Sequence, residues 1–428
     1  MLDESEFRIG FFVAETFQRA MLAPIYEELR HEFPCLLTDD VDQVIEFQPR
    51  ILLVATEYYQ PFRERLRDTI IIWTRHGFAS KNSTKRGVRG CDFACLSSEW
   101  VRDDFIRRGW YPRLGFWITG FVPMDRVLQG DPDDGIKHVP DTLQADQPVL
   151  LYAPTWNRNL SAVEVLGSGW IGQLQRQIPD LQVLIKPHPR MSESHPRAIR
   201  SWREIARSDP RVALVENVNA SVYDLFAIAD VLLTDVSSVM FYYLALDRPI
   251  VLVNNPRRLD ERKYYDPDGY EWAWRDMGIE IESAEDLPQA VARCLEHPSD
   301  QASTRALYRK RVFGAHLRGQ AVKTIAQKVR ALIHPTGTDK AWVEVSWNSV
   351  TAMGDLEAHR QTHTSLSFMR WIRNYLGRSP RTRNIIRRIL FRYPRLHSAT
   401  YQLADRIFGQ NTAGSGQTDR PAKGPQAQ

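Results

Sequence analysis

A strand–helix–strand unit over residues 229–253 constrains the fold of this chain more than any other segment. An apolar strand at 231–233 runs into Thr234-Asp235, Ser237-Ser238 opens an amphipathic helix, and a second apolar strand follows at 250–253. Neighbouring strands that are joined by a crossover helix run parallel. Hydroxyls and unpaired backbone N–H groups at a helix start favour a bound phosphate. The unit therefore points to an enzyme that handles a phosphorylated or nucleotide-linked substrate.

Apolar segments alternate with helical patterns in both halves of the chain, which predicts an α/β fold with two Rossmann-like, doubly wound domains that face a cleft. Strands are expected at residues 7–14, 51–55, 70–73, 93–96, 116–118, 149–153, 183–185, 212–215, 231–233 and 250–253. Helices are expected at 18–31, 99–108, 196–207, 284–295 and 302–332. The expected domains are an acceptor domain at 1–130, a linker at 131–148, a donor-nucleotide domain at 149–335, a basic helical extension at 336–409 and a disordered tail at 410–428.

Charge is distributed unevenly over the 428 residues, whose net charge is +4. From residue 340 to the end there are 14 Lys and Arg against 5 Asp and Glu, and residues 366–409 hold ten arginines and one acidic residue. Two amphipathic helical faces in this extension carry Trp and Tyr, so they could lie on an anionic membrane surface. A helical hairpin packed on the body with a solvated basic face is equally compatible with the pattern. No nucleic acid partner is expected.

The N-terminal residues and the cysteines predict the cellular compartment and the redox state of the thiols. Asp3, Glu4 and Glu6 stand where a signal peptide would be basic and then apolar, and no stretch of 18 residues lacks charge. The four cysteines show no zinc-ligand spacing, so we expect buried, reduced thiols and no metal site. The chain is therefore expected in the cytoplasm, bound peripherally to the inner face of the cell membrane.

A histidine loop follows the predicted strand at 70–73, where α/β enzymes place reacting groups. His76 is followed by Gly77, which permits a sharp turn, and Lys81 can reach an anion. An imidazole titrates near neutral pH and suits a general base. The alternative is a loop histidine beside a surface lysine without a catalytic role.

Three further loops carry groups suited to a phosphate. The loop after 149–153 contains an arginine that can bind a phosphate bidentately. The loop after 183–185 crowds two cations and a histidine among prolines, an arrangement that favours a docked diphosphate. In the loop after 231–233, an aspartate could orient a histidine or accept a ribose or polyol hydroxyl, although serine is also a common helix cap. The donor-side candidates are Thr155, Arg158, Lys186, Arg190, Thr234, Asp235, Ser237 and Ser238, with His188 as a second catalytic candidate.

Taken in chain order, these segments resemble the motifs of the CDP-glycerol:poly(glycerophosphate) glycerophosphotransferases, which build teichoic acids and related capsule backbones. Residues 151–156 are similar to the LYAPTWR segment of that family, and 186–189 to its KxHP segment. Residues 229–239 resemble the family's aDvLITDYSSv segment. Its WHGTxxK loop and GyPRnD turn are similar to 75–81 and 120–125. The resemblance spans residues 73–331 with every motif in the family's order.

The resemblance implies a GT-B architecture with the active site in the cleft. By analogy, the second domain holds a CDP-activated polyol donor with its diphosphate near His188 and Ser237-Ser238, and His76 is the base on the acceptor hydroxyl. Lys81 and Asp125 then lie on the acceptor side. The implied reaction moves a polyol phosphate to a polymer or lipid-linked acceptor and releases CMP. No resident cofactor is implied, and the donor diphosphate can bring Mg²⁺.

The chain departs from the family pattern mainly on the acceptor side, at Arg75, Met124 and Val236. The acceptor, and also the polyol, can therefore differ from glycerol phosphate. Two other functions stay open. One is a GT-B glycosyltransferase or sugar-phosphate transferase that uses a nucleotide sugar in capsule or glycolipid synthesis. The other is an inactive GT-B-like module held at the membrane by its tail.

Overall fold

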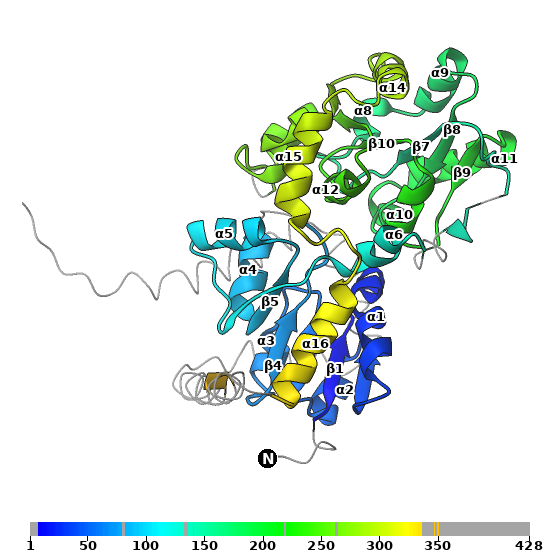
Figure 1. The fold of residues 1–428 in the computed structure, drawn as a ribbon. Coiled ribbons are helices and arrows are strands. Elements are labelled where there is room, and N and C mark those ends of the chain that lie inside the picture. The colour runs from blue at the N-terminus through cyan, green and yellow to red at the C-terminus, as the bar shows by residue number, and fades with distance from the viewer. Residues whose placement is uncertain are drawn as a thin grey trace, which may run out of the picture. The chain divides into compact units, whose positions relative to one another are not determined.

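Two parallel six-stranded sheets organise the computed structural model (Figure 1). It describes residues 7–78, 82–131, 136–139, 141–217, 220–261, 264–335, 346 and 349–350. The basic extension and the tail that the sequence predicts lie almost wholly outside these residues. Within the described part of the chain, no helix combines the length and the apolar character needed to cross a membrane.

The first sheet has the strand order β2-β1-β3-β4-β5-β6, with every neighbouring pair parallel. Its strands are β1 (Ile9–Phe12), β2 (Cys35–Thr38), β3 (Ile51–Val54), β4 (Ile70–Trp73), β5 (Phe93–Leu96) and β6 (Gly115–Ile118). The helices between and after them are α1 (Arg19–Leu29), α2 (Val41–Phe47), α3 (Gln60–Arg63), α4 (Asn82–Gly90), α5 (Glu99–Arg107) and α6 (Asp125–Gln129).

The second sheet has the order β12-β11-β10-β7-β8-β9 and is also parallel. Its strands are β7 (Val149–Tyr152), β8 (Gln182–Ile185), β9 (Val212–Leu214), β10 (Val231–Thr234), β11 (Ile250–Val253) and β12 (Ile279–Ile281). The helices are α8 (Val163–Leu166), α9 (Trp170–Gln177), α10 (Met191–Ser194), α11 (Pro196–Ser208), α12 (Val239–Tyr243), α13 (Tyr270–Ala273), α14 (Leu287–Glu296), α15 (Ala302–Phe313) and α16 (Ala321–Ile333).

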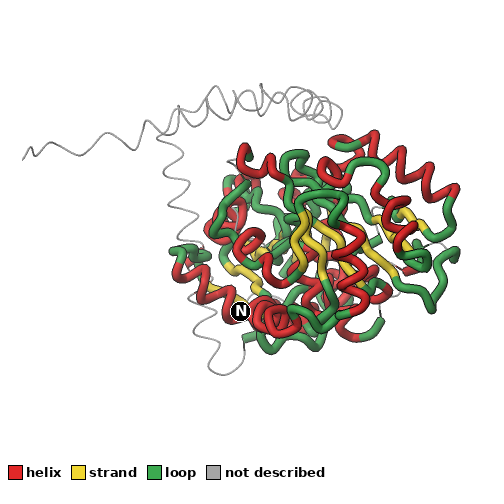
Figure 2. The backbone as a smooth tube through the Cα atoms, turned by 90° about the horizontal axis from the view of Figure 1, so that it is seen from above, coloured by secondary structure: helices red, strands yellow, loops and turns green. Residues whose placement is uncertain are grey.

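The predicted α/β class with two doubly wound sheets is confirmed, and every predicted strand is present. Figure 2 shows the strands enclosed by helices. The central strands are buried on both faces and consist almost entirely of branched and aromatic side chains, as is typical of parallel sheets. Two edge strands, β2 and β12, are not predicted by the sequence. Their apolar signal is short, since β2 has three apolar residues before Thr38 and β12 has Glu280 between two isoleucines.

Two predicted helices differ from those in the structure. The single helix expected at 302–332 is wrong, because α15 and α16 are separated by a turn in which Gly314 has φ +54° and Gly319 has φ +62°. L-residues rarely adopt such angles, so the helix ends there. The helix expected after Ser237-Ser238 contains five α-helical residues in α12 and continues as a short 3₁₀ turn from Leu244 to Leu246.

A single hydrophobic core connects the two sheets. Buried side chains from both form one cluster, while a second cluster lies on one face of the second sheet. Phe121, after β6, stacks on Tyr242 of α12 with ring centroids 3.8 Å apart and planes 7° apart. Phe78, after β4, packs against Phe241 of α12 at 4.8 Å. Aromatic contacts of this kind hold the loops after β4 and β6 against the helix after β10.

Helix α16 packs beside α1 of the first sheet (Figure 1), although its position in the chain predicts a place in the second domain. At its C-terminal end, Arg330 forms ion pairs with Glu28 and Glu32 at 3.2 and 2.6 Å. At its N-terminal end, the buried Asp125 carboxylate accepts hydrogen bonds from the backbone N–H groups of Ala321 and Val322 at 2.9 and 2.8 Å. The expected domain boundaries stay a prediction, and we propose that α16 belongs with the N-terminal half.

We expect Asp125→Ala to lower the free energy of unfolding by about 1–3 kcal/mol, because two backbone donors at the start of α16 lose their acceptor. Urea denaturation followed by circular dichroism measures this change. The exposed Asp131 at the end of α6 supplies the control substitution Asp131→Ala. Equal unfolding midpoints for the two variants would contradict the capping role.

Candidate functional site

The strand order of each sheet reverses at one point. The candidate site lies at the carboxyl ends of the strands beside these two points. The first sheet reverses between β1 and β3, and the second between β7 and β10. Ligands of doubly wound sheets bind outside the carboxyl ends of the strands at such a reversal. The loops at these points are residues 13–18 and 55–57 in the first sheet, and 153–162 and 235–238 in the second. His76 follows β4, next to the first reversal.

Hydrogen bonding fixes the proton of neutral His76 on Nδ1. This nitrogen lies 2.9 Å from the backbone carbonyl oxygen of Ala55, which can only accept, so Nε2 is left without a proton. The Oε1 atom of Glu57 lies 3.6 Å from the same Nδ1. The His76 side chain is 35% exposed, so its ring can meet a ligand. An unprotonated Nε2 with a carboxylate behind the ring is the arrangement of a general base.

His188 has the opposite arrangement. Its Nδ1 accepts a hydrogen bond from the backbone N–H of Arg190 at 3.2 Å. The proton of the neutral ring is therefore on Nε2, which becomes a hydrogen-bond donor. The two histidines that the sequence predicts as catalytic thus differ in role, since one can accept a proton and the other can donate a hydrogen bond to an anion.

The structure brings the two predicted half-sites together. The ring of Phe17, which follows β1, lies 5.8 Å from His76 and 6.1 Å from His188 between ring centroids. Gly77 lies directly against Ser238, because a Cβ atom on this glycine would fall 2.8 Å from the serine Oγ. A larger residue at position 77 would meet the Ser238 hydroxyl and require this side chain to move.

The side chain of Asp235 links the loops that follow β7 and β10 in the second sheet. It is fully buried and accepts hydrogen bonds from the backbone N–H groups of Thr155, Ala162, Val236 and Ser237 at 2.7–3.2 Å. Burial raises the pKa of its carboxyl to about 6, against the opposing effect of these donors. Both oxygens are engaged with backbone, so these bonds favour a structural role over the predicted contact with a ribose or polyol hydroxyl.

The neighbouring hydroxyls fall into two groups. Thr234 is fully buried and donates to the carbonyl oxygen of Ala153 at 2.6 Å, which is a structural bond. Ser237 and Ser238 are half-buried at the start of α12, and the Ser238 hydroxyl does not cap this helix. Thr155, whose backbone Asp235 holds, is half-buried in the facing loop. Both serines and Thr155 are therefore placed to contact a ligand, whereas Thr234 is not.

The three cations predicted to bind phosphate are engaged with the protein. Lys186 donates to the carbonyl oxygens of Val215 and Asn217 at 3.3 and 2.7 Å, and burial lowers its pKa to about 8. Arg158 is exposed and binds the carbonyl oxygen of Ser194 through two nitrogens at 2.8 and 2.6 Å. The guanidinium of Arg190 forms an ion pair with Glu15.

Of the two acceptor-side candidates, the structure describes only Asp125. Lys81 lies outside the described residues. Asp125 caps α16, so its carboxylate is occupied there. All four cysteines are free thiols, as expected, and three of them are buried. Within the described residues, no cluster of three or more His, Cys, Asp or Glu side chains could hold a metal ion.

Three residues at the site were missed by sequence reasoning, namely Glu15, Phe17 and Glu57. A signal for the two glutamates was available, because each stands shortly after the end of an apolar strand. Phe17 carries no such signal, since an aromatic residue in a loop is ordinarily read as part of the core.

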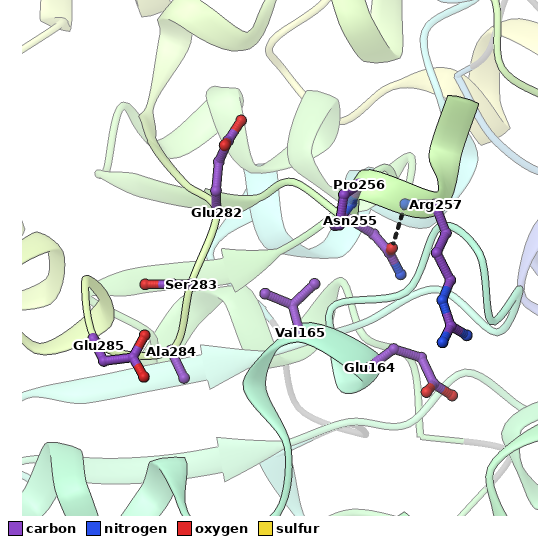
Figure 3. Close-up of a pocket in the computed structure, with 9 residues that line it drawn as sticks. All are labelled: Glu164, Val165, Asn255, Pro256, Arg257, Glu282, Ser283, Ala284 and Glu285. Atoms are coloured by element: carbon purple, nitrogen blue, oxygen red, sulfur yellow. Dashed lines mark hydrogen bonds between the residues drawn. The ribbon is translucent and has the colours of Figure 1, made fainter. Parts of the chain in front are cut away.

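A separate pocket of about 260 Å³ lies beyond the carboxyl ends of β11 and β12 (Figure 3). Asn255 accepts from the backbone N–H of Arg257 at 2.9 Å and donates to the carbonyl oxygens of Arg158 and Ser161 at 3.0 Å each. None of the residues that the sequence predicts for the site lines this pocket. Its lining is Glu164, Val165, Asn255, Pro256, Arg257, Glu282, Ser283, Ala284 and Glu285.

Replacement of the buried carboxylate tests whether it organises the loops. We expect Asp235→Asn to lower the free energy of unfolding by about 2–4 kcal/mol, because the amide turns an N–H₂ donor toward backbone donors. Chemical denaturation measures the change, and Asp180→Asn at an exposed position is the control. A variant as stable as the wild type would show that the carboxylate does not hold these loops.

The chain is similar to known proteins in sequence and in fold. The chain is 31% identical over 137 residues to the teichoic acid glycerol-phosphate primase of Bacillus subtilis (strain 168), a match that covers 31% of this chain and about a third (33%) of that relative. A structure of the wall teichoic acid polymerase TagF superposes with a TM-score of 0.59 at 16% identity, covering 77% of this chain and 89% of that chain.

The fold is shared more widely. A UDP-GlcNAc 2-epimerase from Neisseria meningitidis gives a TM-score of 0.51 at 13% identity, over 76% of this chain and 99% of that one. The model of one family matches residues 66–330, which is most of the chain and contains His76 and the site loops of the second sheet, while the loops at 13–18 and 55–57 precede the match. The chain belongs to the CDP-glycerol:poly(glycerophosphate) glycerophosphotransferase family.

Proposed function

We propose that this protein transfers a polyol phosphate from a CDP-linked donor to an acceptor hydroxyl and releases CMP. The observation that carries the proposal is the opposite proton placement on His76 and His188, whose rings both contact Phe17. Family membership supports the class of donor. Group transfer between an alcohol and a diphosphate needs one group that accepts a proton and others that donate hydrogen bonds to the leaving phosphate.

The reaction follows from these positions. The acceptor hydroxyl gives its proton to Nε2 of His76 while its oxygen attacks the phosphorus next to the polyol. The bond from that phosphorus to the bridging oxygen of the diphosphate breaks, and CMP leaves with this oxygen. Glu57, close to Nδ1 of His76, stabilises the positive charge that the ring gains.

The donor diphosphate is proposed to lie near His188, Ser237 and Ser238. The Nε2–H of His188 and the two serine hydroxyls donate hydrogen bonds to the charge that develops on the leaving phosphate. Thr155 lies on the facing loop and can contribute another hydroxyl. Mg²⁺ can accompany the donor, because phosphate oxygens are the hard ligands that this ion prefers.

We propose supporting roles for the surrounding cations. Lys186 and Arg158 support the loops through backbone carbonyls. A charged Lys186 still contributes positive potential near the diphosphate, and its lowered pKa places the loss of that charge at about pH 8. Lys81 stays a proposal for the acceptor side.

The acceptor is proposed to be a polymer or lipid-linked chain of the teichoic-acid or capsule type. The related proteins named above are a teichoic acid primase and a wall teichoic acid polymerase. We propose that the enzyme works in the cytoplasm at the inner face of the membrane, where the basic extension at 336–409 would meet anionic lipids. The support for this location is the excess of basic residues after residue 340.

Product analysis tests the reaction class. Incubation with CDP-glycerol, CDP-ribitol and several UDP-sugars, together with a lipid-linked acceptor, should release CMP from a CDP-polyol. Release of UDP alone would contradict the proposal and favour a glycosyltransferase.

Substitution of each histidine tests the two roles separately. His76→Gln should lower kcat by about 10²–10⁴-fold, because the base is lost, and leave CDP binding by calorimetry unchanged. His188→Leu should weaken CDP binding as well as lower kcat, because it removes a donor to the diphosphate. The control is His31→Ala, because His31 is exposed and lies shortly after α1. Full turnover in either site variant would refute that residue's role.

Deletion of residues 366–428 tests the location. The truncated protein should move from the vesicle fraction to the supernatant when it is sedimented with phosphatidylglycerol vesicles, because ten arginines are removed from 366–409. Unchanged partitioning would show that the extension does not bind the membrane.

A further inference from the structure

The segment after β1 reaches across to the second sheet through Glu15. Its carboxylate accepts hydrogen bonds from Nε of Arg190 at 3.2 Å and from Nη2 of the same guanidinium. Arg190 lies in the loop after β8, directly before α10. Both side chains are partly buried, with 27% of Glu15 and 37% of Arg190 exposed. A two-bond arginine–carboxylate pair fixes orientation as well as distance.

Arg190 in turn holds His188. The backbone N–H of Arg190 is the group that donates to Nδ1 of His188. The guanidinium also lies over the ring of Trp156, 5.2 Å from its centroid. Glu15 therefore anchors the side chain of Arg190. The backbone N–H of Arg190 in turn determines which ring nitrogen of His188 carries the proton.

The same short segment is itself held in place and contacts both histidines. Gln18 is buried, and its side-chain oxygen accepts the backbone N–H of Ala14 at 3.1 Å. The ring of Phe17 contacts the rings of both His76 and His188. A rotation of this segment would therefore disturb the contact between the two half-sites.

We propose that Glu15 is a positioning residue that acts through Arg190 to keep His188 in the orientation and tautomer of an Nε2–H donor. The inference rests on the proposed function, and it replaces the predicted role of Arg190 as a phosphate ligand. The histidine on the donor side is then correctly set only while the loop after β1 of the first sheet touches the second sheet. The orientation and tautomer of His188 therefore depend on the contact between the two sheets.

Ring ¹⁵N NMR of histidine-labelled protein tests the proposal without substrate. The His188 signals, assigned with His188→Leu, should show an unprotonated Nδ1 and a protonated Nε2 in the wild type. In Glu15→Ala and Glu15→Gln, we expect the two nitrogen shifts to move toward each other as the tautomers mix. The control is Glu27→Ala, which breaks an exposed ion pair with Arg30 on α1. Unchanged His188 shifts in both Glu15 variants would overturn the proposal.

A double-mutant cycle supplies the kinetic readout. Glu15→Ala and Arg190→Ala should each lower kcat for CMP release by about 10–100-fold, because a small displacement of a catalytic group has effects of this size. The double variant should be no slower than Arg190→Ala. Multiplying effects would mean that the two residues act separately and would overturn the proposal. If the wild type released no CMP, the proposed function would fail, while the NMR shifts would still report on positioning.

Discussion

The aromatic contact between the two sheets is the interaction on which the candidate site depends. Phe121 stacks on Tyr242, and Phe78 packs against Phe241, so the helix after β10 is held by loops of the first sheet. Each ring removes a large apolar area from water. Separate domains commonly move against each other across small polar interfaces, whereas this interface is apolar and continuous with the core. It places the carboxyl ends of two parallel sheets face to face.

This placement gives two similar residues different chemistry. His76 and His188 each follow a strand and each have Nδ1 engaged by backbone, yet one partner is a carbonyl and the other an N–H. The partner alone determines which ring nitrogen keeps the proton. The ring of Phe17 contacts both histidines, with its centroid 5.8 Å from that of His76 and 6.1 Å from that of His188. The asymmetry distinguishes an acceptor side from a donor side.

Much of the fold and part of the candidate site could be predicted from the sequence, because the signals for them are local. Apolar strands followed by polar loops made His76, His188 and the two serines candidates, and the order of the motifs identified the family. Long-range pairings carry no local signal. The Glu15–Arg190 ion pair and the cap of α16 by Asp125 join residues far apart in the chain. Cationic loops carry a second signal, since Lys186 and Arg158 also donate to backbone carbonyls that folding removes from water.

The most direct measurement is a crystal structure of the His76→Gln variant in complex with CDP-glycerol. Our account predicts that a diphosphate oxygen lies within about 2.6–3.2 Å of Nε2 of His188 and of the Ser238 hydroxyl. It also predicts that the phosphorus next to the polyol faces the side chain at position 76. Nucleotide bound instead in the pocket beyond β11 and β12, away from both histidines, would contradict the account.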